Sequence, residues 1–309
     1  MILTQEQEMI RESLREFAQE RLAPFAGEWD RNHTFPAEAL RELGELGALG
    51  MVVPEEWGGA GMDYMSLVLV IEEIAAGDGA TSTIVSVQNS LACGITMKYG
   101  TDEQKETWLK PLASGEKLGC FCLTEPHTGS DAAAITTRAD RDGDHFVLNG
   151  VKQFITTGKY GQVAIVFAVT DKAAGKKGIS CFLVPTDTPG YIVARIEEKM
   201  GQRASDTAQI LFENCRVPAS CLLGTEGDGY RIALSNLEAG RIGIAAQSVG
   251  MARAAFECAV QYAKDRETFG KPIIEHQAVN FRLADMATQI DAARLMVWRA
   301  ATFKDDGKL

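Results

Sequence analysis

Residues 121–131 read FCLTEPHTGSD, a short apolar run that breaks into a polar turn. Alternation along the run places Phe121 and Leu123 on one face of a predicted strand and Cys120 and Cys122 on the other. The strand is therefore expected to end at the start of a loop that is rich in hydroxyl and amide groups.

The polar half of this stretch has the chemistry of a ligand-binding loop. Pro126 removes a backbone donor, and Gly129 is expected to let the chain turn back where other residues would clash. Thr124, Thr128 and Ser130 supply hydroxyls. Such a loop could hold a flat polar heterocycle at its strand end and an anionic group at its turn end. A capped turn between two strands is the alternative interpretation.

Composition excludes several classes of protein. The chain has 309 residues, of which 46% are hydrophobic and 24% charged, as in a globular protein of one large domain or two to three smaller ones. The net charge of −11 opposes binding to nucleic acid or to anionic membranes.

A capping box at 4–7 opens a helix directly, without a cleavable signal. We expect a cytoplasmic protein or a mature mitochondrial matrix form.

The cysteines and histidines indicate no metal site. Cysteines stand at seven scattered positions without a Cys-x-x-Cys pair, so we expect them reduced and mostly buried. Cys120 and Cys122 are interpreted as neighbours on one strand face, not as a redox pair. The four histidines have no spacing that suits a shared metal.

The predicted elements change type twice along the chain. Residues 1–119 are expected to form a helical N-terminal domain, 120–225 a compact antiparallel β-domain, and 226–309 a helical C-terminal domain. Helices are predicted over 37–49, 64–76, 81–99, 102–112, 230–266 and 274–303. Strands are predicted over 163–169, 179–184, 191–194 and 210–212. Hairpin turns are predicted at 149–150 and 142–144.

A second run, NGVKQFITTG at 149–158, follows in the predicted β-domain. Together with 121–131 it resembles the flavin-binding signatures of the acyl-CoA dehydrogenase family, and further matches extend to about Leu309. The resemblance implies an α+β multidomain fold with a helical N-terminal domain, an antiparallel β-barrel middle domain and a C-terminal helical bundle. It also implies FAD as the cofactor.

The resemblance assigns flavin-binding roles residue by residue. Thr156 matches the residue that hydrogen-bonds the flavin near N5, and Phe154, on the same strand face, is expected to pack on the dimethylbenzene side. Thr124 matches a contact to the pyrimidine ring, and Ser130 one near the pyrophosphate and the CoA arm. The complete set of expected cofactor-binding residues is Phe121, Leu123, Thr124, Ser130, Phe154, Ile155, Thr156, Arg266, Phe269 and Gln277.

The segments at 266–270 and 276–277 resemble elements that reach the FAD pyrophosphate of a neighbouring subunit. A guanidinium such as that of Arg266 suits this contact because its planar fork binds phosphate in two places. The resemblance therefore implies a homo-oligomer, a tetramer built as a dimer of dimers. An exposed Arg at a helix C-terminus is the alternative.

The segment EAGR at 238–241 resembles the part that contacts the substrate. Ser130, Glu238, Gly240 and Arg241 are the expected substrate-binding residues. Some branches of the family carry their base at the position of Gly240, and others in a later Tyr-Glu-Gly-Thr run, which residues 1–309 do not contain. The resemblance thus implies a truncated, C-terminally incomplete bundle, and no catalytic residue is assigned.

The function implied is FAD-dependent α,β-dehydrogenation of a short-chain or branched-short-chain acyl-CoA to trans-2-enoyl-CoA. Electrons would pass to an electron-transferring flavoprotein. Two alternatives stay open: a relative that passes electrons to oxygen, such as an acyl-CoA oxidase or flavin monooxygenase, and a non-catalytic flavin-binding fragment that lacks the base.

Overall fold

The structure is a computed structural model that describes residues 2–308. The chain forms two compact units. One unit contains the described residues up to Gly27, Asp63–Thr83, and those from Ile242 onward; the other contains Glu28–Met62 and Ile84–Arg241. Each unit is thus assembled from segments that are distant in sequence. The predicted domain boundaries at 119 and 225 stay a prediction.

The first third of the chain is helical, as predicted. Its helices are α1 (Gln5–Phe17), α2 (Ala23–Asn32), α3 (Ala37–Glu45), α4 (Tyr64–Gly77), α5 (Gly79–Val87), α6 (Gly94–Tyr99), α7 (Asp102–Gln104) and α8 (Lys110–Ala113), with π-helical turns at Ala18–Leu22, Gln88–Cys93 and Lys105–Leu109. The capping box is confirmed, because the Gln7 N–H donates to the Thr4 hydroxyl at 3.2 Å and the Thr4 N–H to the Gln7 side chain at 3.1 Å.

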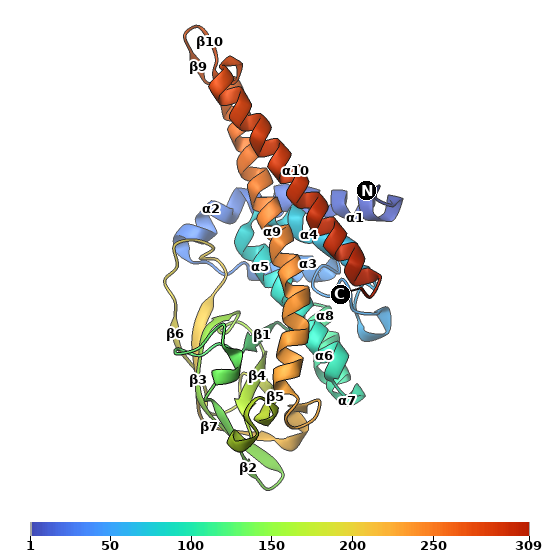
Figure 1. Ribbon diagram of the computed structural model, residues 1–309, viewed down its shortest axis with the longest axis vertical. Coiled ribbons are helices and arrows are strands. Elements are labelled where there is room, and N and C mark those ends of the chain that lie inside the picture. The colour runs from blue at the N-terminus through green and yellow to red at the C-terminus, as the bar shows by residue number, and fades with distance from the viewer. Residues whose placement is uncertain (1, 309) are drawn as a thin grey trace. The chain divides into compact units, whose positions relative to one another are not determined.

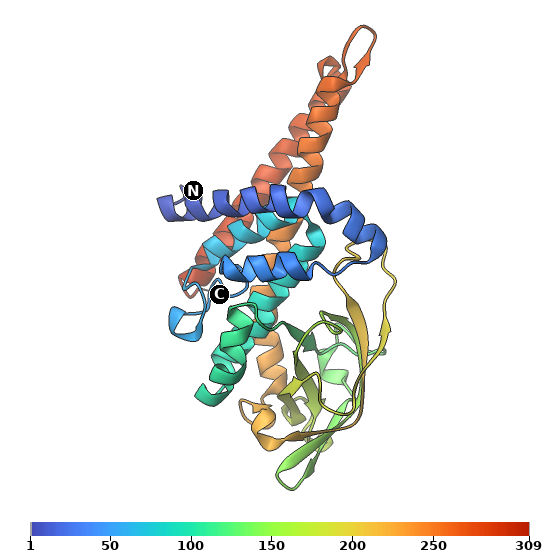
Figure 2. The ribbon, with the colours of Figure 1, turned by 180° about the vertical axis from the view of Figure 1, so that it is seen from behind.

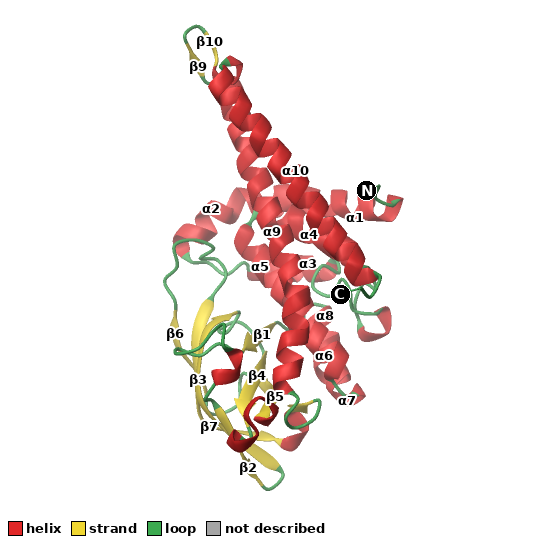
Figure 3. Ribbon diagram, viewed as in Figure 1, coloured by secondary structure: helices red, strands yellow, loops and turns green. Residues whose placement is uncertain are grey.

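The middle of the chain forms a sheet (Figure 3). Its strands are β1 (Gly119–Cys122), β2 (Arg138–Asp142), β3 (His145–Thr156), β4 (Val163–Val169), β5 (Ile179–Pro185), β6 (Tyr191–Ile196), β7 (Thr207–Pro218) and β8 (Leu222–Leu223). Along the sheet the order is β6-β7-β3-β2-β4-β5-β8, with β1 also paired to β4.

The expected antiparallel barrel is wrong in two respects. The sheet is open, because among the described strands β6 pairs only with β7 and β8 only with β5. Closure would require two edge strands to pair, and β8 is only two residues long. The sheet is also mixed, since β1 and β2 both run parallel to β4 while its other partner, β5, is antiparallel.

The predicted turn at Asn149–Gly150 is also wrong, because both residues lie inside the continuous strand β3. The pairing of β3 with β7 shifts register between Leu148 and Gly150, so the glycine marks a bulge. A Cβ on Gly150 would lie 2.4 Å from the Thr137 hydroxyl, so close backbone approach requires glycine here. The predicted turn at 142–144 is confirmed, with Gly143 at φ +61° between β2 and β3.

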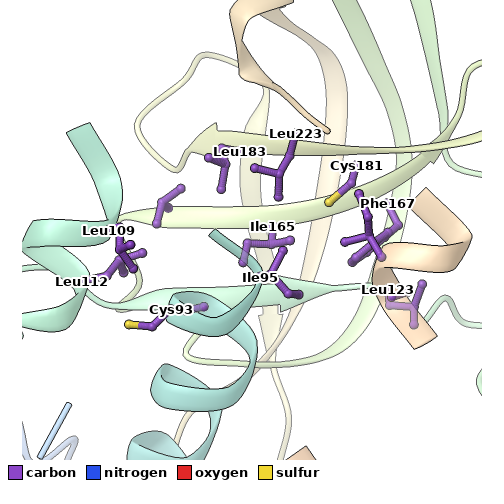
Figure 4. Packing of buried hydrophobic residues seen from close by; sticks show 14 of the residues in the cluster. Cys93, Ile95, Leu109, Leu112, Leu123, Ile165, Phe167, Cys181, Leu183 and Leu223 are labelled. Carbon is purple, nitrogen blue, oxygen red and sulfur yellow. The ribbon is translucent and has the colours of Figure 1, made fainter. Parts of the chain in front are cut away.

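The sheet packs apolar residues on both faces. One face meets the helices through Ile95, Leu109, Leu112, Leu123, Ile165, Phe167, Cys181, Leu183 and Leu223, among others (Figure 4). The other face holds a second cluster that includes Cys120, Cys122, Phe146, Phe182 and Phe212. The predicted alternation is confirmed, because Phe121 and Leu123 belong to the first cluster and Cys120 and Cys122 to the second.

Two long helices follow, as predicted: α9 (Gly229–Asp265) and α10 (Gln277–Asp305). A hairpin of β9 (Glu267–Thr268) and β10 (Lys271–Pro272) connects them, and near this hairpin the two helices run side by side in both views (Figures 1 and 2). Across residues 2–308, no helix has the length and apolarity needed to cross a membrane.

Candidate functional site

The polar loop predicted from the sequence connects two strands that lie end to end. β1 pairs with Val163–Val166 of β4, and β2 begins opposite Val169 on the same edge of that strand. Segment 123–137 therefore leaves the sheet where β1 ends and returns where β2 begins. This arrangement raises a polar loop above a continuous apolar strand.

The loop is closed by its own hydrogen bonds and not by glycine. Glu125 and Thr128 exchange backbone N–H···O bonds of 2.9 and 3.1 Å, and the Thr128 hydroxyl donates to the Asp131 carbonyl at 2.6 Å. Gly129 does not have a positive φ, and a Cβ added to it would lie 4.0 Å from the nearest atom. The expectation that Gly129 is required by a clash is wrong.

A buried ion pair lies beneath the loop. The Lys152 ammonium, which is fully buried, contacts a Glu125 carboxylate oxygen at 2.9 Å and the Leu123 carbonyl at 3.0 Å. The same carboxylate accepts the backbone N–H groups of Thr136 at 2.7 Å and Thr137 at 2.9 Å. The pair thus ties β3 to both ends of the loop.

The two charges have perturbed pKa values. Burial alone would raise the pKa of Glu125, but the Lys152 charge and the surrounding hydrogen bonds outweigh burial and lower this pKa to about 2. Burial lowers the pKa of Lys152, while Glu125 opposes that shift. Each charge therefore favours the ionised form of the other.

The structure brings the two sequence runs together. The Gln153 N–H donates to the Thr124 carbonyl at 2.8 Å, beside the Lys152 contact to Leu123. The start of the loop and the second half of β3 consequently form one continuous surface. This contact joins the two stretches that carried the resemblance.

A β-bulge sets the direction of the last residues of β3. Lys152 pairs with Ile210 and Ile155 with Ala208, so Gln153 and Phe154 both lie opposite a single residue of β7. Phe154 has φ +59°, and 62% of its surface is exposed. Ile155 is buried in the core, whereas Thr156 is half-buried. An aromatic ring is therefore presented to solvent next to a hydroxyl.

Three predicted ligand hydroxyls have no protein partner. Within residues 2–308, no hydrogen bond involves the hydroxyls of Thr124, Thr156 or Ser130. Thr124 and Thr156 are half-buried, and Ser130 is exposed. Each hydroxyl can donate one hydrogen bond and accept others. The surface formed by the loop and β3 therefore offers free donors beside an exposed aromatic ring.

Thr157 follows Thr156, and its N–H donates to the carbonyl of Asp206 at 3.2 Å; the sequence motifs indicated neither residue. Thr157, at φ +60°, and Asp206 are buried, and the Asp206 carboxylate accepts the Lys159 N–H at 2.8 Å. Burial raises the pKa of Asp206 to about 6, against weaker opposing effects from Lys159 and Lys199. Strand alternation could have placed Lys152 on the buried face with Phe146 and Leu148; no local sequence signal indicated Asp206.

The substrate segment lies on α9. Ile232 and Ala233, in its first turns, belong to the same core cluster as Leu123. Glu238 and Arg241 follow on exposed positions, and no ion pair within the described chain engages either side chain. A Cβ on Gly240 would make only ordinary contacts, at 3.6 Å or more, so the backbone does not require glycine there.

The remaining predicted cofactor residues belong to the other unit. Arg266 precedes the β9–β10 hairpin, Phe269 lies at its tip with 98% of its surface exposed, and Gln277 is the first residue of α10. Arg266 is exposed, with no ion pair to any residue the structure describes. These side chains lie within one short segment and face solvent.

Comparison with known proteins agrees with the succession of a helical, a sheet and a second helical region along the chain. Three family models match in succession: the acyl-CoA dehydrogenase N-terminal domain over residues 4–116, the middle domain over 120–215 and the C-terminal domain over 227–309. The chain belongs to the acyl-CoA dehydrogenase family. The protein is thus an acyl-CoA dehydrogenase, with the helical N-terminal domain, middle β-sheet domain and helical C-terminal part of that family.

Several acyl-CoA dehydrogenases are similar over nearly the whole chain. The mitochondrial short-chain specific acyl-CoA dehydrogenase of Rattus norvegicus is 47% identical over 306 residues, covering 99% of this chain and 74% of that protein. The butyryl-CoA dehydrogenase structure from Megasphaera elsdenii aligns with TM-score 0.97 at 41% identity, covering 99% of this chain and 81% of that one.

A third relative was solved with a flavin. The glutaryl-CoA dehydrogenase structure from Mycobacterium smegmatis, in complex with FADH2, aligns with TM-score 0.93 at 40% identity and covers 98% of this chain and 77% of that one.

Proposed function

We propose that this acyl-CoA dehydrogenase binds FAD at the surface formed by the loop and β3, oxidises short-chain or branched-short-chain acyl-CoA, and passes electrons to an electron-transferring flavoprotein. The hydrogen bond between Gln153 and Thr124 carries the proposal, because it joins the two flavin signatures into one surface. Its cytoplasmic or mitochondrial location stays a prediction.

The residues present are suited to the cofactor. A flavin ring has an apolar dimethylbenzene edge and a polar pyrimidine edge, and this surface offers an exposed Phe154 ring beside the unpaired hydroxyls of Thr124 and Thr156. Bound FAD would supply the hydride acceptor of the reaction. Phe121 of β1, Leu123 directly after β1 and Ile155 of β3 support these groups, and the exposed Ser130 would lie near the pyrophosphate.

The hairpin residues support a site completed by a second subunit. Arg266 has no ionic partner among the described residues, and Phe269 is almost fully exposed. An unpaired guanidinium suits a pyrophosphate, and a bare aromatic side chain suits burial by another surface. We propose that Arg266, Phe269 and Gln277 contact the FAD of a neighbouring subunit in a tetramer built as a dimer of dimers.

For the proposed dehydrogenation, the protein must bind the thioester of the substrate and accept a proton from it. Removal of the α-proton leaves negative charge on the thioester oxygen, which hydrogen-bond donors stabilise. The proton passes to a carboxylate base, and loss of the β-hydrogen as hydride gives trans-2-enoyl-CoA. Glu238, Gly240 and Arg241 on α9 are proposed to line the substrate arm, with Arg241 as the charged contact to CoA.

The short-chain assignment is supported by the relatives' names. The rat protein is described as short-chain specific, and the Megasphaera elsdenii protein as a butyryl-CoA dehydrogenase. Identities of 47% and 41% over nearly the whole chain make a short acyl group the first substrate to test.

Cofactor binding and reduction test the proposal. The purified protein mixed with FAD should show a flavin absorbance spectrum that differs from that of free FAD. Titration with acyl-CoAs of increasing length should bleach it best with butyryl-CoA or a branched analogue, and a dye acceptor should support turnover. Failure to bind FAD would contradict the proposal. Rapid oxygen consumption by the reduced protein would favour the oxidase or monooxygenase alternative.

A further inference from the structure

The Glu125–Lys152 ion pair lies directly behind the residues proposed to contact FAD. Its charged atoms are 2.9 Å apart, and the two side chains are 1% and 0% exposed. Neither group can therefore reach a ligand in the loop above. Any role in the reaction must act through the residues to which the pair is bonded.

One bond from the pair and two backbone hydrogen bonds beside it fix three consecutive residues at the start of the loop. The Leu123 carbonyl accepts from Lys152 at 3.0 Å, and the Thr124 carbonyl accepts from the Gln153 N–H at 2.8 Å. The Glu125 N–H donates to the Thr128 carbonyl at 2.9 Å. The Thr124 backbone is thus held on both sides, while its hydroxyl stays free for a ligand.

The same carboxylate also holds the other end of the loop. Glu125 accepts the N–H and the hydroxyl of Thr136 at 2.7 and 2.9 Å and the N–H of Thr137 at 2.9 Å. Lys152, in turn, is two residues before Phe154 on β3. One buried pair therefore connects the beginning of the loop, the end of the loop and the strand that carries the aromatic ring.

Two apolar side chains could fill the same volume but could not connect both ends of the loop to β3 by hydrogen bonds. Two buried charges lose their hydration, and well-packed apolar side chains often replace such pairs without loss of stability. What apolar side chains lack is directional bonding to the Leu123 carbonyl and to the N–H groups of Thr136 and Thr137. The particular contribution of the pair is therefore geometry.

We propose that Glu125 and Lys152 are a positioning pair that holds the Thr124 backbone against strand β3 and thereby sets how tightly, and in what electronic environment, the flavin is bound. This inference rests on the proposed function. A displacement of the loop would separate the proposed pyrimidine contact on Thr124 from the proposed N5 contact on Thr156, although neither residue had been changed.

The test is the double variant E125Q/K152M, which removes both charges and leaves no unpaired ion. The matched control is E106Q/K110M, because Glu106 and Lys110 form an exposed pair of 2.7 Å whose side chains are 57% and 41% exposed. For each apoprotein the thermal midpoint, the Kd for FAD and the visible spectrum of bound flavin are measured. The spectrum is a readout that a purely structural role would leave unchanged.

The expected result separates stability from binding. E125Q/K152M should unfold cooperatively near the midpoint of the control, while its Kd for FAD rises at least about tenfold and its flavin absorbance maximum moves. A folded double variant with the Kd and spectrum of the starting protein would overturn the inference and leave the proposed function intact. If the unaltered protein does not bind FAD, the proposed function fails and the inference fails with it.

A second variant decides the case in which the double variant does not fold. Glu125→Gln keeps the shape of the side chain, and its amide oxygen can still accept an N–H from Thr136 or Thr137. It removes the charge that holds Lys152 and one of the two acceptor oxygens. A raised Kd for FAD in this folded variant supports the positioning role, and an unchanged Kd and spectrum refute it.

Discussion

At the scale of single residues, the raised pKa of Asp206 predicts that the free energy of unfolding depends on pH. Burial raises its pKa from 3.8 to about 6, although the backbone N–H of Lys159 and the charge of Lys199 oppose the shift. The unfolded chain therefore ionises near pH 4 and the folded protein near pH 6, so the free energy of unfolding falls as pH rises between these values.

Asp206→Asn should remove this pH dependence. The amide cannot ionise, and its oxygen can still accept the Lys159 N–H. We expect the variant to be about 3 kcal/mol more stable than the unaltered protein above about pH 7 and nearly equal below about pH 4, by urea denaturation. The exposed Asp187→Asn serves as control. A variant that is less stable at neutral pH would show that the ionised carboxylate is favourable.

At the scale of elements, Gly143 in the turn between β2 and β3 and Gly150 inside β3 both have a positive φ, but only Gly150 is also closely packed. A Cβ on Gly150 would lie 2.4 Å from the Thr137 hydroxyl and 2.7 Å from its Cα, whereas around Gly143, at φ +61°, nothing lies within 4 Å. Gly143→Ala should cost about 1 kcal/mol, from the left-handed backbone alone. Gly150→Ala should cost about 3 kcal/mol because backbone must also move.

Denaturant unfolding of the two alanine variants measures this difference directly. Equal losses would mean that β2 shifts away from β3 without cost. In that case the bulge, and not the close approach, would be the reason for glycine at 150.

The same elements show what the sequence can and cannot predict. Strand alternation correctly separated Phe121 from Cys122, and hydrophobic spacing predicted the long helices, because both patterns are local. Asn149–Gly150 has the composition of a hairpin turn, yet the chain continues straight through it. Whether such a pair turns or bulges depends on β2 and β7, which pack on either side of β3.

The residues proposed to meet a ligand could be predicted from the sequence, and the residues that support them less so. Thr124, Phe154 and Thr156 stood out because they lie in the two runs that resemble family motifs. Lys152 and Asp206 act through partners 27 and 47 residues away, so their roles depend on tertiary contacts. The β-bulge at Phe154 could not be predicted from the local sequence either, because it is a property of strand pairing.

At the scale of the whole molecule, one unit is assembled from three separate stretches of chain, and buried charges connect its helices. Glu72 and Glu73 of α4 contact Arg15 of α1, Arg253 of α9 and Arg294 of α10. Burial would raise the pKa of Glu73, but hydrogen bonds from Arg253 and Arg15 lower it. In Glu72 burial prevails and raises the pKa despite Arg294 and Arg253.

Arg253→Met should therefore destabilise this unit far more than loss of a surface ion pair. The guanidinium contacts both carboxylate oxygens of Glu73, whose side chain is 2% exposed, and its removal leaves that carboxylate with Arg15. We expect a loss of about 3–5 kcal/mol in the free energy of unfolding. Arg41→Met is the control, because the Arg41–Glu45 pair is 62% and 65% exposed and should contribute under about 1 kcal/mol.

The pH dependence of the loss identifies its cause. Without Arg253, burial should dominate at Glu73 and raise its pKa, so the folded variant should bind a proton more readily than its unfolded chain. The deficit measured by urea denaturation should then be smaller near pH 5 than near pH 8, because protonation removes a buried charge that Arg15 alone then compensates. A deficit that is constant with pH would assign the loss to the packing of the Arg253 side chain against its neighbours, and not to its charge.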